Sequence, residues 1–156
     1  MNHFHELLNE YAEDGGLDAA RLVATSDVVI DGVTISLMPD GDPDVGDVIF
    51  YAELAPRPES VHPVTLRAVL EANMLWAGTG GCTLGLHPEA ECITVCLRIA
   101  LRDLDASTLA AMLEHFAEIV KTWDGHLADL AASLRTPIDD ADLDPAPSSR
   151  HQFLIA

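Results

Sequence analysis

The chain has 156 residues, 49% of them hydrophobic, and its 26 acidic against 8 basic residues give a formal net charge of −18. The length and composition predict one globular domain with its own core, and the charge disfavours nucleic acid and anionic membrane surfaces as partners. No apolar run reaches the roughly 18 residues of a membrane span and the start lacks a signal-peptide pattern, so we expect a cytoplasmic protein.

The first half of the sequence predicts one helix followed by three strands. Apolar residues at helical spacing predict an amphipathic helix over residues 3–13, which ends at a glycine pair. Two β-rich runs follow, and Asp31-Gly32 inside the first run is a hairpin signal. We therefore expect strands near 27–30, 33–38 and 47–55.

The second half predicts a helix, a hairpin and a long final helix. Pro63 suits the first turn of the second helix, which breaks at Gly78, Gly80 and Gly81. A strictly alternating hairpin follows, and its turn predicts that Leu84 lies opposite Val95. The final helix starts near Asp105 and keeps apolar residues at spacings of three and four through residue 134.

These elements predict an α+β domain of order α-βββ-α-ββ-α, in which helices pack on a mostly antiparallel sheet. We place this domain at residues 1–135 and an acidic, proline-containing, flexible tail at 136–156. The apolar triplet in the terminal "RHQFLIA" is the one part of the tail that could return to an exposed strand edge or groove, and a frayed end is the simpler interpretation.

The sequence holds no pattern typical of a catalytic, cofactor or metal site. The order helix, glycines, strand is the reverse of a phosphate-binding loop, in which the glycines precede a helix. Cys82 is expected on the core face of the sheet and Cys92 and Cys96 on the other face, which favours neither a disulfide nor a zinc cluster. His3 and His5 could bind a metal weakly, but solvated side chains are the simpler interpretation. We therefore predict no enzyme activity, no cofactor and no metal.

Excess apolar surface is the feature that points to function. The stretch "VIFYAEL" is hydrophobic on both faces of a strand, although a half-solvated strand should alternate. The second helix carries Leu75 and Trp76 outside its core stripe. An ordinary two-sided core would explain both features, and the other interpretation is contact with a second copy or a bound polypeptide.

The residues resemble the class I type III secretion chaperones, the Tir chaperone family. The resemblance spans about residues 3–134, from "LLNEYAEDGGLD" through the "VTISL" strand, and its most specific part is "LEANMLWAGTGGCTLGLHPE". It implies a homodimeric, non-enzymatic chaperone that binds the N-terminal region of a secreted effector in extended form. Such a chaperone keeps the effector soluble and secretion-competent and delivers it to the export apparatus.

The resemblance also implies which residues form each contact. A dimer built from the second helix and the following strand would use residues at the helix end and in the glycine turn: Leu70, Asn73, Met74, Leu75, Trp76, Gly80 and Gly81. Effector would contact the first helix and first three strands through five apolar or aromatic anchors: Phe4, Leu8, Ile35, Ile49 and Tyr51. The alternative function is a small acidic regulator, an anti-activator or nucleic-acid mimic, that binds a basic protein.

Overall fold

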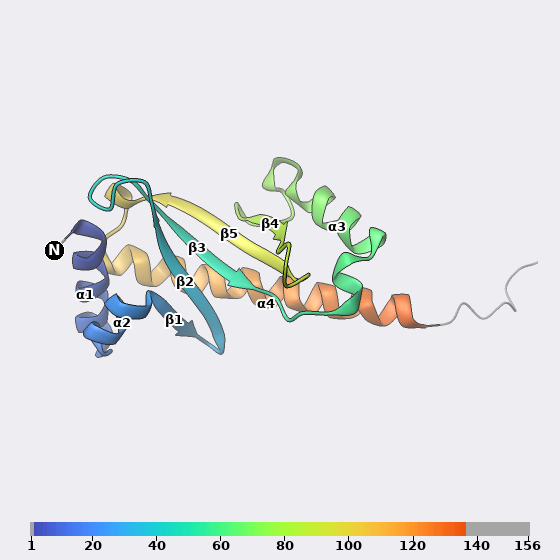
Figure 1. The fold of residues 1–156 in the computed structure, drawn as a ribbon, viewed down its shortest axis with the longest axis horizontal. Helices are drawn as coiled ribbons and strands as arrows, with labels where there is room; N and C mark the ends of the chain where they lie inside the picture. The colour runs from blue at the N-terminus through green and yellow to red at the C-terminus, as the bar shows by residue number, and fades with distance from the viewer. Residues whose placement is uncertain (1, 137–156) are drawn as a thin grey trace, which may run out of the picture.

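The structure, a computed structural model, describes residues 2–136 as one α+β domain (Figure 1). Its helices and strands are, in order, α1 (His3–Gly15), α2 (Ala19–Thr25), β1 (Asp27–Ile30), β2 (Val33–Asp40), β3 (Asp47–Glu53), α3 (Pro63–Asn73), β4 (Thr83–Leu86), β5 (Ile93–Ala100) and α4 (Ala106–Arg135). Short 3₁₀ turns are η1 (Pro58–Val61), η2 (Met74–Trp76) and η3 (Leu101–Asp103). The predicted order is confirmed, with α2 in addition. Beyond residue 136, the predicted acidic tail lies outside the described residues.

The five strands form one antiparallel sheet of order β1-β2-β3-β5-β4. Each observed strand lies close to its predicted range, and the β4–β5 register places Leu84 opposite Val95, as the hairpin pattern predicts. Consecutive strands pair except where β5 lies between β3 and β4. Strand β1 is therefore one edge of the sheet and β4 is the other.

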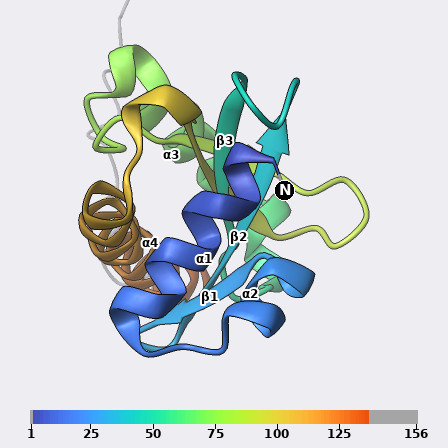
Figure 2. The ribbon, with the colours of Figure 1, turned by 90° about the vertical axis from the view of Figure 1, so that its left-hand side faces the viewer.

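The core lies between one face of the sheet and the helices α1 and α4. Helix α4 runs along the sheet, with α1 and α2 at one end of the molecule and α3 at the other (Figure 1). Figure 2 shows α4 nearly end-on, with α1 crossing in front of the sheet. Phe50 of β3 meets Phe116 of α4 with ring centroids 5.9 Å apart, and both rings are fully buried. Each such ring contributes about 1.5–3 kcal/mol by leaving water.

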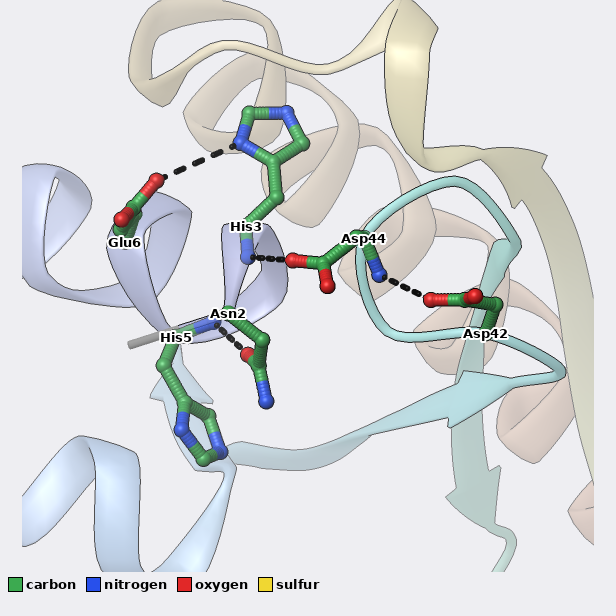
Figure 3. Close-up of polar contacts among 6 residues, drawn as sticks. All are labelled: Asn2, His3, His5, Glu6, Asp42 and Asp44. Atoms are coloured by element: carbon green, nitrogen blue, oxygen red, sulfur yellow. Dashed lines mark hydrogen bonds and ion pairs between the residues drawn. The ribbon is translucent and has the colours of Figure 1, made fainter.

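The start of α1 is held by its own cap and by the β2–β3 loop (Figure 3). The Asn2 side chain accepts from the His5 amide at 2.9 Å, while the Asp44 carboxylate accepts from the His3 amide at 2.8 Å. The Pro43 carbonyl accepts from the Phe4 amide at 3.0 Å. Three amides that a helix N-terminus leaves without helical partners are thereby bonded, which sets the position of α1 against the sheet.

Helix α3 ends earlier than the sequence predicts. It stops at Asn73, and the next residues form η2, in which Leu75 and Trp76 adopt φ values of 55° and 54°. Side chains with a Cβ rarely occupy this left-handed region, which costs roughly 1–2 kcal/mol per residue. The predicted helical run through Trp76 is therefore wrong, and both side chains leave the helix surface on a separate turn.

Candidate binding surfaces

The outer face of the sheet carries half-buried apolar side chains. Along β3, burial alternates so that Val48, Phe50 and Ala52 face the core while Ile49 and Tyr51 face outward. The register places Ile49 beside Met38 of β2, which is 41% exposed. The outward face of "VIFYAEL" is thus an accessible apolar strip, as expected for a surface that contacts another polypeptide.

Three of the five predicted effector anchors are not accessible. Phe4 and Leu8 of α1 are 2% and 0% exposed, and Ile35 of β2 is 0% exposed. All three belong to the chain's own core, because the apolar stripe of α1 packs onto the sheet and α4. An amphipathic stripe has the same sequence pattern whether it faces a core or a ligand, which explains the error. Ile49 and Tyr51 remain as candidate anchors.

Polar groups frame this outer face. The Tyr51 hydroxyl donates to the Glu53 carboxylate at 2.8 Å, and partial burial together with this hydrogen bond raises the pKa of Tyr51. Arg98 of β5 forms ion pairs with Asp40 and Asp47 at the ends of β2 and β3. These pairs hold the guanidinium beside the start of β3, while the Glu53 carboxylate lies at the end of β3 next to the Tyr51 hydroxyl.

A groove of about 610 Å³ lies between α1, α2 and the edge strand β1. It is lined by residues from α1, α2, β1 and β2 and from the loop between the two helices: Tyr11, Gly15, Leu17, Asp18, Arg21, Leu22, Thr25, Asp27, Val28, Val29, Ile30 and Thr34. Side chains from both faces of β1 line it, so the groove opens on the edge of the strand. Leu17 and Val29 are 48% and 65% exposed there.

The backbone of β1 has free hydrogen-bonding groups on this edge. The Ser26 carbonyl accepts from the Leu37 amide at 2.8 Å, so Ser26 turns its polar groups toward β2. Because this direction alternates along an antiparallel strand, Val28 also faces β2 and Val29 faces outward. The amide and carbonyl of Val29 are thus available to an added strand.

Sequence reasoning missed this groove. Asp18 is an N-cap signal for α2, and its side chain accepts from the Arg21 amide at 3.0 Å. However, α2 has only seven residues, too few for an apolar period to identify it. The adjacent valines Val28 and Val29 gave no indication of which one faced outward.

A second apolar surface, here called the α3–η2 patch, consists of Leu70, Met74, Leu75 and Trp76. Their exposed fractions are 70%, 71%, 80% and 56%. The buried residues of α3 are Thr65 and Val69, so Leu70 lies on the exposed side of the helix. The patch adjoins β4, because α3 and β4 are in contact.

The other three predicted interface residues make contacts within the chain. The Asn73 side chain donates to the Leu84 carbonyl and accepts from the Leu84 amide, both at 2.9 Å, which fastens the end of α3 to β4. Gly80 and Gly81 have φ values of 60° and 90°. A Cβ on Gly80 would lie 2.9 Å from a methyl carbon of Ile119. Gly80 therefore lets the turn after η2 approach α4 closely.

The cysteines are free thiols, and Cys82 and Cys92 are both buried. Burial raises the pKa of Cys82 to about 11 and also raises the pKa of Cys96. Cys92, just before β5, is buried but lies outside the core cluster, and it interacts electrostatically with Tyr51 and Glu53 of the outer face, which agrees with the expected side of the sheet. Residues 2–136 contain no group of His, Cys, Asp and Glu side chains able to hold a metal.

Three solved structures similar to this chain are complexes, and the names of two of them include a chaperone. A chain of the HopA1–SchA chaperone–effector complex matches with 15% identity and a TM-score of 0.63, over 79% of this chain and 94% of that one. The ExsC–ExsE complex matches with 16% identity and a TM-score of 0.65, over 80% and 95%. The Yersinia pestis type III secretion chaperone SycH, in complex with a fragment of YscM2, matches with 17% identity and a TM-score of 0.55, over 76% and 98%. These likenesses confirm the α+β fold.

No curated protein sequence matches this chain. Within residues 2–136, no helix combines the length and apolar character needed to cross a bilayer. The model of the Tir chaperone protein (CesT) family matches residues 16–124, which include every strand, the glycine turn and most of α4. Because the family model matches well over half of its length, the chain belongs to the Tir chaperone protein (CesT) family.

Proposed function

We propose that the protein is a cytoplasmic, non-enzymatic type III secretion chaperone that binds an effector's N-terminal region in extended form at the β1 edge. The free edge of β1 beside the 610 Å³ groove carries this proposal. An extended segment paired with β1 gains main-chain hydrogen bonds from Val29, while its alternate side chains enter the groove or face the outer sheet. The family membership and the likeness to chaperone–effector complexes support the same function.

The outer sheet face continues this binding surface. Thr34 pairs with Val29 across β1 and β2, and Ser36 pairs with Tyr51 across β2 and β3. The exposed side chain of Val29 therefore lies on the same sheet face as Tyr51 and Ile49, with Thr34 and Ser36 between them. An effector that leaves the β1 edge over this face would bury those apolar groups without any change in the chaperone core.

The protein functions as a homodimer joined through the α3–η2 patch. Four large apolar side chains that are more than half exposed lie on one short segment, which is more than an isolated surface normally carries. In a two-fold dimer the same patch of each protomer faces its partner, so the four side chains are buried in both protomers. The β1 edges remain free because they lie away from α3 in each protomer (Figure 1).

Val29→Pro tests the binding edge with Val29→Thr as its matched control. Proline removes the outward amide of Val29 without breaking the β1–β2 ladder, whereas threonine keeps the amide and the β-branched shape. Both variants are co-expressed with N-terminal fragments of candidate effectors encoded beside the chaperone, and complexes are quantified by calorimetry. We expect Val29→Pro to weaken binding at least tenfold relative to Val29→Thr, with both variants equally folded by circular dichroism.

Equal affinity of these two variants for the same effector fragment would refute binding at β1. The salt dependence of binding distinguishes the proposed chaperone function from the alternative function, an acidic mimic of nucleic acid. Strand addition with apolar burial persists at high ionic strength, whereas binding of a folded basic protein collapses, because salt screens exposed charges. A complex that forms only with basic domains and only at low salt would favour the mimic.

A further inference from the structure

The groove beside β1 holds one charged group that has no partner among the described residues. Six of the seven described Lys and Arg side chains form ion pairs: Arg57 with Asp124, Arg67 with Glu71, Arg98 with Asp40 and Asp47, Arg102 with Asp103, Lys121 with Asp31, and Arg135 with Glu59. Within residues 2–136, only the guanidinium of Arg21 has none. In a chain with 26 acidic residues, an unpaired arginine stands out.

The two carboxylates that share the groove are already used. Asp18 caps α2 by accepting from the Arg21 amide at 3.0 Å. Asp27 accepts from the Ser36 hydroxyl at 2.6 Å. Neither forms an ion pair with Arg21, and no other charged residue lines the groove. Arg21 thus lines the groove with five guanidinium donors that have no acceptor among the described residues.

We infer that Arg21 makes the groove selective for an extended segment that carries an acidic side chain, aspartate or glutamate, where the segment passes α2. The inference rests on the proposed binding at β1 and adds the chemistry of the bound sequence. A segment in the groove removes water from Arg21, and a carboxylate replaces that water with charge-assisted, bidentate hydrogen bonds. A basic side chain at the same position is repelled.

This local preference opposes the charge of the whole chaperone. The net charge of −18 attracts basic segments over long distances, but salt screens that attraction beyond about 8 Å under physiological conditions. Arg21 acts at contact distance and so fixes the register of the segment. The expected ligand therefore alternates apolar residues with one acidic residue at a defined place.

Peptide display tests the inference without knowledge of the natural effector. A library of random peptides about twelve residues long is selected for binding to the full-length protein. This length covers one strand and a few residues on each side of it. Clones that also bind Val29→Pro are discarded, so that only ligands of the β1 edge remain. Parallel selections use Arg21→Gln, Arg21→Glu and Arg102→Glu, the last a control with the same charge change at a residue of η3.

We expect Asp or Glu to be enriched at one position in clones selected on the wild type and on Arg102→Glu. The preference should disappear with Arg21→Gln and change to Lys or Arg with Arg21→Glu. In a selected peptide, replacing the acid by its amide should weaken binding to the wild type about tenfold and leave binding to Arg21→Gln unchanged. That double-mutant comparison isolates the pair from any effect on folding.

Two negative outcomes are distinguishable. Clones that depend on Val29 but show no acidic preference would overturn the role of Arg21 and leave strand addition intact. The same acidic preference on Arg21→Gln would overturn it equally. A library that yields no clone dependent on Val29 would overturn the proposed binding site and this inference with it.

Discussion

Replacing Leu75 by asparagine should dissociate the proposed dimer without unfolding the protomer. Leu75 is 80% exposed and has a φ of 55°, a backbone conformation that asparagine tolerates better than leucine. Complete burial of a leucine is worth about 1.5–3 kcal/mol, so burial of the exposed part in an interface contributes roughly 1.2–2.4 kcal/mol. Two-fold symmetry doubles this figure to roughly 2.4–4.8 kcal/mol, so the dimer Kd should rise roughly 60- to 3,000-fold.

Sedimentation equilibrium over a dilution series measures this dimer Kd. The matched control is Val45→Asn, because Val45 is 74% exposed and lies in the β2–β3 loop at the end of the molecule away from α3 (Figure 1). Leu70→Gln provides a second interface variant within regular helix α3. If Leu75→Asn and Leu70→Gln both dimerise with the affinity of Val45→Asn, the α3–η2 patch is not the interface.

Three further outcomes follow from single contacts. Asn73→Ala leaves the amide and carbonyl of Leu84 without partners and should lower the free energy of unfolding by about 2–4 kcal/mol. Urea titrations measure this change, and an unchanged midpoint would contradict a stabilising role of the Asn73–Leu84 hydrogen bonds. Gly80→Ala should be destabilising by about 1–3 kcal/mol more than Gly41→Ala, because both have positive φ but only the first would meet a side chain of α4. With a pKa of about 11, Cys82 should react with iodoacetamide at pH 8 roughly 100-fold more slowly in the folded than in the unfolded protein. Because Cys82 is also fully buried, a rate in the folded protein close to that in the unfolded protein would contradict this environment.

Local patterns were sufficient to predict most of the fold. The strict alternation of β5 and the turn before it defined the hairpin and its register, since both depend on residues adjacent in sequence. The stripe of α4 and its Asp105 cap likewise defined the final helix. The short α2 was missed because seven residues cannot show a helical period, although Asp18 marked its start.

The candidate site was predictable only in part, because a pattern does not reveal which neighbour covers an apolar face. The alternation of β3 put Ile49 and Tyr51 on the face opposite Val48 and Phe50 without showing which face is exposed, and the structure places them on the outer face. Phe4 and Leu8 follow the same amphipathic logic but pack on the sheet, a contact between distant parts of the chain. The sequence also did not predict the left-handed backbone at Leu75, because leucine has no local preference for that conformation.

The strand order has a consequence for how long a cargo must be. Four spacings of about 4.8 Å separate β1 from β4, so each sheet is roughly 19 Å wide. In the proposed dimer, joined beside β4, the two β1 edges lie at opposite sides, about 40 Å or more apart. A single polypeptide that occupies both edges therefore needs a connecting stretch of at least about twelve extended residues. Such a cargo binds at two places at once, so modest affinity at each edge is sufficient to retain it. Release begins when the cargo dissociates from either edge.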